Sequence, residues 1–113
     1  MGAVSMYVDM LSSAVGAWDG ALSREALLDH TVDCRVRMLA TGTAHGASAY
    51  DALAAEIAYD RALIHLCSHV GIGASPRWFD QPDAERTRLE QTLAEMASID
   101  LVSLSRGRAE DLA

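Results

Sequence analysis

One arginine and two carboxylic acids fall inside apolar helical patterns, where their charge could do chemistry. When residues are placed at about 100° steps, Arg35 lies near the centre of the apolar face made by Leu28 and Val32. Glu56 and Asp60 lie within the apolar face of a later segment in the same way. A charge that is removed from water is costly unless it is paired. The pattern therefore predicts a polar group of side chains in an otherwise apolar core.

A structural ion pair is the first interpretation of these charges. In an antiparallel helical hairpin, Arg35 lies about one turn from the level of Glu56, and its guanidinium spans that gap of about 6 Å. Asp60 lies about twice as far along, so its expected partner comes from another helix or another subunit. The alternatives are a polar pocket in which these three residues bind a small ligand or catalyse a reaction, and an edge of the apolar face that is open to water.

Two histidines form a candidate metal pair. His65 and His69 have the H-x-x-x-H spacing that places two imidazoles on one face of a helix. Two ligands do not complete a site, and a third would have to come from His30 or His45. The alternative is that both histidines interact with the negative end of a helix dipole. Because no E-x-x-H motif occurs, a di-iron carboxylate bundle is excluded, and no cofactor is expected.

Signatures of nucleophilic and redox chemistry are missing from the sequence. There is no G-x-S-x-G motif, and Gly71-x-Gly73 follows no strand pattern, so it is not a dinucleotide loop. Cys34 and Cys67 should lie far apart in a helical hairpin, which argues against a redox pair. The sequence therefore favours a role without catalysis.

Four helical segments are expected to position these residues. They cover about 3–18, 23–40 and 48–70, and the last opens at 79–82 and frays near 98–100. Ser23 and Ser48 are typical N-caps, Asp80 is a further candidate, and Gly20, Gly42 and Gly71 are typical stops. Four helices with short loops predict an all-α, up-down-up-down four-helix bundle over residues 1–104, with a mobile tail over 105–113. Arg86 and Glu90, four residues apart, are expected to pair on the surface of the last helix.

Composition limits the classes of protein that remain. The 113 residues are 50% hydrophobic and carry a formal net charge of -7, with neither Lys nor Asn. This apolar content is too high for a disordered chain, and the acidic balance argues against a nucleic-acid partner. No apolar run approaches the roughly 18 residues of a membrane span, and no basic leader is present, so a cytoplasmic protein is expected. The bias toward Ala and Arg is typical of a GC-rich bacterial genome.

Apolar residues in excess of one helical face predict a contact surface. A segment that is apolar nearly all round, such as 48–70, must be central or shared between subunits. The alternatives are a monomer with this helix at its centre and, around Trp78, a hydrophobic staple that closes the bundle. The expected interface residues are Met6, Met10, Tyr59, Leu63, Leu66 and Trp78.

The leading hypothesis is a small cytoplasmic helical module that engages a protein partner or a second copy of itself, with the bundle completed by homodimerisation. The second hypothesis is a bundle that binds a ligand or a metal through Arg35, Glu56 and Asp60, together with His65 and His69. A small enzyme built on the same polar core ranks third.

Overall fold

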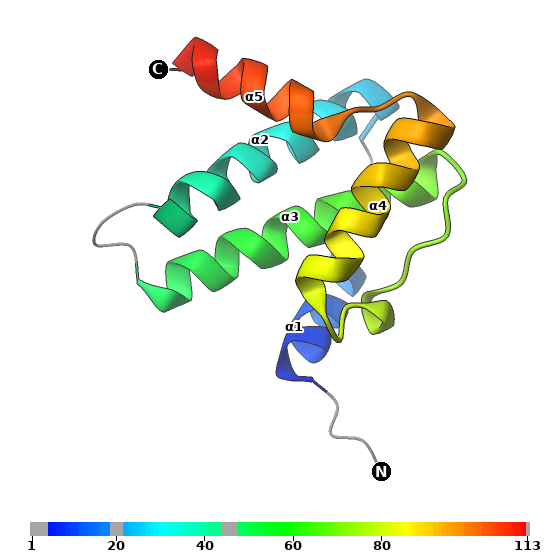
Figure 1. Ribbon diagram of the computed structural model, residues 1–113. Coiled ribbons are helices and arrows are strands. Elements are labelled where there is room, and N and C mark those ends of the chain that lie inside the picture. The colour runs from blue at the N-terminus through cyan, green and yellow to red at the C-terminus, as the bar shows by residue number, and fades with distance from the viewer. Residues whose placement is uncertain (1–4, 19–21, 44–47, 113) are drawn as a thin grey trace.

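The chain is all-helical in the computed structural model, which describes residues 5–18, 22–43 and 48–112 (Figure 1). Five α-helices occur in these ranges: α1 (Met6–Gly16), α2 (Arg24–Thr43), α3 (Ala49–His69), α4 (Pro82–Ala97) and α5 (Leu101–Leu112). A short 3₁₀ helix, η1 (Pro76–Trp78), precedes α4. The all-α prediction is confirmed, whereas a four-helix bundle is not, because α5 adds a fifth helix. None of the helices in the described ranges is both long enough and apolar enough to cross a membrane.

Helix ends follow the capping residues of the sequence at several points. The hydroxyl of Ser23 accepts a hydrogen bond from the N–H of Ala26 at 3.1 Å, which starts α2. Ser48 and Asp51 form a capping box at the start of α3. Gly71 follows the end of α3 with a φ of +82°, a conformation that glycine adopts without strain.

Two expected helix ends are wrong. Gly42 does not stop α2, which continues to Thr43. The N-cap of α4 is Gln81 and not Asp80, and no side chain caps this end. Pro82 at the first helical position favours the start of α4 instead, since its fixed φ suits a helix start. The expected stop at Gly20 lies outside the described residues.

Residues 105–112 of the segment that was expected to form a mobile tail lie in α5. The carboxylate of Asp100 accepts hydrogen bonds from the N–H of Ser103 at 3.1 Å and from its hydroxyl at 2.9 Å. These bonds lower the pKa of Asp100, and they give the N–H of Ser103 in the first turn of α5 a hydrogen-bond acceptor. Ser105 is only 2% exposed, so the helix is held by packing. Ala113 lies outside the described residues.

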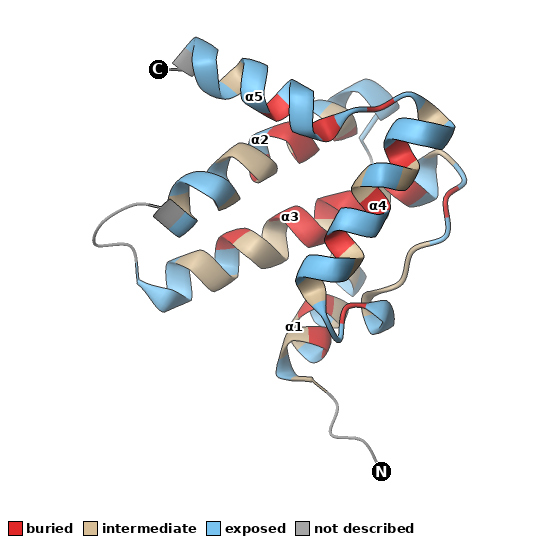
Figure 2. Ribbon diagram, viewed as in Figure 1, coloured by how far each residue is buried: buried red, intermediate tan, exposed pale blue. Residues whose placement is uncertain are grey.

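α3 is the central helix of the fold. α2 runs antiparallel beside it, and α1 and α4 also pack against it (Figures 1 and 2). Tyr59, Leu63 and Leu66 of α3 are fully buried at 0% exposure. Each buried side chain of this size stabilises the fold by about 1.5–3 kcal/mol relative to exposure. The expectation that these three residues form an intermolecular surface is therefore wrong, because the core of a single chain already covers them.

Candidate functional site

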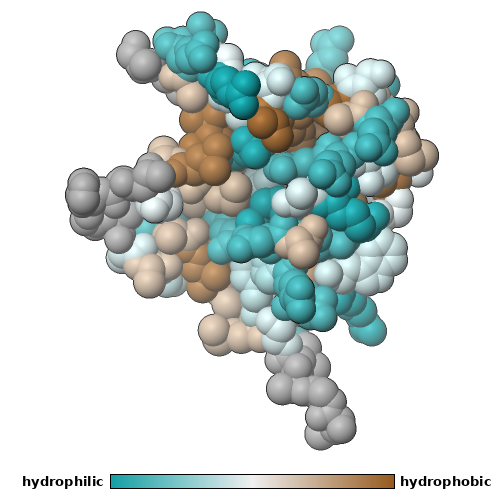
Figure 3. Space-filling view, viewed as in Figure 1, coloured by the Kyte–Doolittle hydropathy of each residue, from teal (hydrophilic) through white to brown (hydrophobic). Residues whose placement is uncertain are grey.

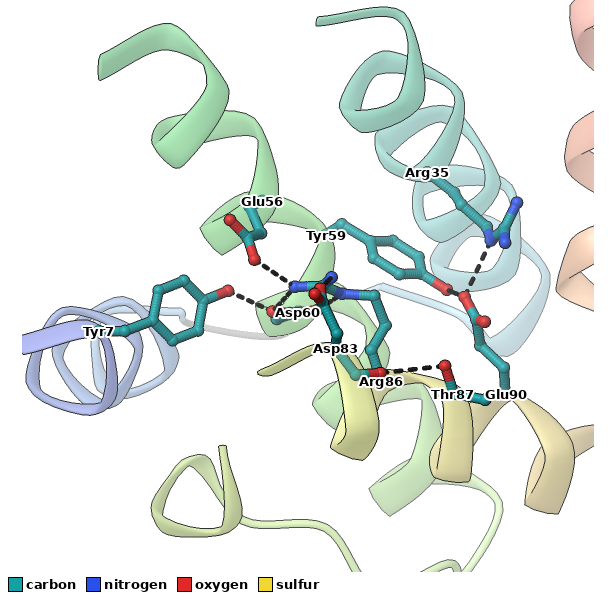
Figure 4. Close-up of polar contacts among 9 residues, drawn as sticks. All are labelled: Tyr7, Arg35, Glu56, Tyr59, Asp60, Asp83, Arg86, Thr87 and Glu90. Atoms are coloured by element: carbon teal, nitrogen blue, oxygen red, sulfur yellow. Dashed lines mark hydrogen bonds and ion pairs between the residues drawn. The ribbon is translucent and has the colours of Figure 1, made fainter. Parts of the chain in front are cut away.

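Arg86 of α4 stands at the centre of a polar group between the helices (Figure 4). Its Nε and Nη2 atoms donate to the two carboxylate oxygens of Asp60, each at 2.7 Å. Nη2 also donates to Glu56 at 2.7 Å, and Nη1 donates to Asp83 at 2.9 Å. Tyr7 of α1 donates its hydroxyl to Asp60. These five residues, the Arg86 cluster, join α1, α3 and α4 through one guanidinium.

Asp60 is the most deeply buried member of the Arg86 cluster. Its side chain is 0% exposed, and that of Arg86 is 11% exposed. Burial raises the pKa of Asp60, while the hydrogen bonds and charge of Arg86 act in the opposite direction. Burial also raises the pKa of Tyr7, so its hydroxyl remains a donor at neutral pH. Because three donor atoms already occupy the Asp60 oxygens, this carboxylate is not free to act as a base or as a metal ligand.

Burial and pairing also oppose each other at the guanidinium. Burial lowers the pKa of Arg86, but the hydrogen bonds and charges of Asp60 and Glu56 outweigh it and raise this pKa above its usual value. Arginine therefore stays charged, and its planar fork matches the carboxylate of Asp60. The geometry is that of an ion-pair network in which one guanidinium bonds three carboxylates.

A second ion pair lies beside the Arg86 cluster. Nε of Arg35 donates to Oε2 of Glu90 at 2.9 Å, and their side chains are 13% and 11% exposed. The hydroxyl of Tyr59 donates to the same oxygen (Figure 4). Burial and the charge of Glu90 raise the pKa of Tyr59, which keeps this hydroxyl protonated. The second pair thus connects α2, α3 and α4.

The structure changes the partners that were expected for these charges. The predicted pair of Arg35 with Glu56 is wrong, because α4 supplies a separate partner to each of them. The prediction that Asp60 meets a residue of another helix is confirmed by Arg86. The expected surface pair of Arg86 with Glu90 is wrong, since each side chain turns toward a different buried partner.

Arg86 and Glu90 are the site residues that the sequence reasoning missed. The signal was present, because Arg86 precedes Leu89 by three residues and Leu93 by seven, the spacing of one helical face. Both leucines are 0% exposed. Arg86 therefore lies within an apolar helical face in the same way as Arg35, and the same periodicity rule, applied to this segment, points to it.

The two candidate metal ligands lie in different surroundings. The ring of His65 stacks on Trp18, with centroids 5.1 Å apart, and the ring of His30 lies 5.4 Å from Trp18. Burial lowers the pKa of His65. His69 is exposed in the last turn of α3. Within the described ranges, no group of three or more His, Cys, Asp or Glu side chains is placed to hold a metal ion, and His45 lies outside those ranges.

Two apolar grooves open on the surface away from the Arg86 cluster. The α1–α3 groove has a volume of 460 Å³ and is lined by Met10, Ser13, Tyr50, Leu53, Ala54, Ile57, Ala58 and Arg61. The α2–α5 groove has a volume of 500 Å³ and is lined by Arg35, Val36, Leu39, Ala40, Val102, Ser105, Arg106 and Ala109. Neither Glu56 nor Asp60 lines either groove, whereas Arg35 of the second ion pair lines the α2–α5 groove.

The remaining interface candidates lie at the surface. Met6 is 71% exposed, Met10 is half-buried in the α1–α3 groove, and Trp78 is 51% exposed. The guanidinium of Arg88 lies 5.5 Å from the ring centroid of Trp78. Phe79, at 0% exposure, closes the core at this end.

The fold and the two ion-pair groups together define a small all-helical protein in which Asp60 and Glu56 pair with Arg86, and Arg35 pairs with Glu90. No protein-family model, curated protein or solved structure matches the chain.

Proposed function

We propose that the protein is a non-catalytic helical interaction module that forms a homodimer through the α2–α5 groove. The observation that carries the proposal is an accessible apolar surface shared by two helices. Leu39 of α2 is 48% exposed and Val102 of α5 is 38% exposed, and both line this groove. Figure 3 shows hydrophobic residues along the side of α2 that faces α5, whereas the outward side of α4 is hydrophilic.

Charge also favours this groove as the contact surface. Two copies of a chain with a net charge of -7 repel each other, so a contact is favoured where carboxylates are few. Arg35 and Arg106 line the α2–α5 groove, and its lining includes no Asp or Glu. Glu110 and Asp111 are exposed at the end of α5.

A two-fold arrangement uses these charges in a complementary way. A symmetric dimer places the same surface of both copies in contact, and this symmetry is the commonest among soluble oligomers. With two α5 helices antiparallel, Glu110 of each copy can lie against Arg106 of the other. The apolar groove then supplies the buried area, and the charges supply the register.

The polar core is not proposed as the functional site, although the sequence offered it as an alternative. Asp60 and Glu56 are held by Arg86, and Arg35 is held by Glu90. A site that binds a polar ligand needs unsatisfied groups that converge on a cavity. The contacts of these residues instead support a structural role, in which the charges fix how α4 sits on α2 and α3.

Sedimentation velocity from micromolar to millimolar protein tests the dimer. The wild type is expected to convert from monomer to dimer as its concentration rises, and Leu39→Glu is expected to stay monomeric because it places a charge in the groove. Met96→Glu is the matched control, since Met96 is 74% exposed on α4 and does not line the groove. A monomeric wild type at millimolar concentration contradicts the proposal, as does a Leu39→Glu variant that dimerises like the wild type.

Charge reversal tests the arrangement within the dimer. Arg106→Glu is expected to weaken dimerisation, and adding Glu110→Arg to the same chain is expected to restore it. If the double variant is weaker than Arg106→Glu alone, the antiparallel pairing of α5 is wrong.

A further inference from the structure

Arg61 of α3 differs from the other shielded arginines of the chain. Arg35, Arg86 and Arg108, which are buried or half-buried, each pair with at least one carboxylate. Arg61 is also half-buried, yet no ion pair or hydrogen bond joins it to a carboxylate among the described residues. Its Nε is buried and has no hydrogen-bond partner in that part of the chain. A partly desolvated guanidinium without an anion is a costly arrangement that a bound anion relieves.

The guanidinium of Arg61 is held in place by an aromatic ring. Its central carbon lies 4.8 Å from the ring centroid of Trp18, which is within the range of a cation–π contact. This contact fixes the position of the charge without satisfying its hydrogen-bond donors. Arg61 is therefore a hydrogen-bond donor that Trp18 holds in position and that lacks an acceptor oxygen within the described structure.

The α1–α3 groove leads along α3 to this charge. Apolar side chains form most of its lining, from Tyr50 in the first turn of α3 through Leu53 and Ile57, and Arg61 lies at the far end. The eleven residue-to-residue steps from Tyr50 to Arg61 span about 16 Å at a rise of about 1.5 Å per residue. A volume of 460 Å³ falls within the range of small-molecule sites.

We propose that the α1–α3 groove binds an aliphatic carboxylate, with the alkyl chain along α3 and the carboxylate on Arg61. An extended apolar groove that ends in one cation matches a ligand that is apolar along its length and anionic at one end. Arginine binds a carboxylate through two parallel N–H···O bonds, which the free N–H groups of a guanidinium supply. The proposed dimer uses the α2–α5 groove, so the ligand site in the α1–α3 groove does not depend on dimerisation.

Titration of the ¹⁵N-labelled protein with octanoate tests the site by amide chemical shifts. Octanoate is expected to shift the amides of α1 and those of α3 from Tyr50 to Arg61. Octyltrimethylammonium has the same alkyl chain with the opposite charge, and it is expected to bind at least about tenfold more weakly. Failure of octanoate to shift these amides overturns the proposal, and equal binding of the cation shows that only the alkyl chain is recognised, which overturns it too.

Two variants separate the charge from the groove. Arg61→Met is expected to weaken octanoate binding at least about tenfold, because a charge-assisted hydrogen bond is lost. Arg37→Met is the control, since Arg37 is exposed on α2 and does not line the groove. Ala54→Trp, at an exposed position of the lining, is expected to block the groove while Arg61 is kept. Undiminished binding by Arg61→Met or by Ala54→Trp contradicts the proposed site.

Discussion

Removing Arg86 is expected to destabilise the protein more than removing any other arginine. The Asp60 side chain is 0% exposed in the native chain, and Arg86→Met removes its cationic partner. Breaking a buried ion pair on one side typically costs about 3–5 kcal/mol. The contact with Asp83 adds little, because that side chain is 97% exposed and screened by water. The expected loss is therefore a large part of the free energy of unfolding, which is about 5–15 kcal/mol for ordinary domains.

Urea unfolding followed by circular dichroism measures this loss. Arg108→Met is the matched control, because Arg108 pairs with Asp29 and Asp33, whose side chains are 64% and 51% exposed. Each exposed pair contributes about 1 kcal/mol or less. If Arg86→Met costs no more than Arg108→Met, the claim that Arg86 neutralises a buried carboxylate is refuted.

A double variant separates the charge from the packing. Arg86→Met combined with Asp60→Leu removes both members of the buried pair and leaves apolar groups in their place. Because a buried pair is about as favourable as well-packed apolar residues, the double variant is expected to recover most of the lost stability. A double variant that is less stable than Arg86→Met contradicts this explanation.

Three further predictions concern single residues. Tyr7→Phe removes a hydrogen bond to a buried carboxylate and is expected to cost about 1.5–3 kcal/mol in urea unfolding, whereas Tyr50→Phe, at a side chain that is 76% exposed, should cost nothing measurable. The lowered pKa of His65 stabilises the fold above the usual histidine pKa of 6.5, and this contribution is lost as the pH falls from there through the lowered value. The stability of the wild type relative to His65→Phe should therefore decline on acidification, and an unchanged difference contradicts the assignment. Burial raises the pKa of Cys67 to about 12 and also raises that of Cys34, so neither thiol should react with a disulfide reagent until urea unfolds the chain, and rapid reaction of the folded protein contradicts their burial.

The parts of the fold that local chemistry determines were predictable from the sequence. Ser48 with Asp51 is a local capping pattern, and the structure confirms it. The all-helical class follows from periodicity and composition in the same way. α5 was not predictable on this basis, because Ser105 and Gly107 have weak helix propensity. Contact with α2, including the ion pairs of Arg108, stabilises this helix instead.

The presence of charged residues in the core was predictable from the sequence, but the partner of each charge was not. The rule that a charge within an apolar face needs a partner identified Arg35 and Asp60 correctly as members of a buried polar group. The partners depend on how α4 lies across α2 and α3, which helix periodicity does not determine. Tyr59 shows the same limit, because its burial depends on the number of helices that surround α3.

Paramagnetic broadening between copies tests the proposed dimer most directly. A nitroxide on Gly107→Cys in unlabelled chain, mixed with ¹⁵N-labelled wild type, reports only contacts between copies. A side chain at Gly107 meets no atom within 4 Å in the described structure, and the native thiols of Cys34 and Cys67 are buried. The proposed function predicts broadening of amides in α2 and α5 of the labelled chain. Broadening confined to α1 and α3, or no broadening at millimolar concentration, contradicts it.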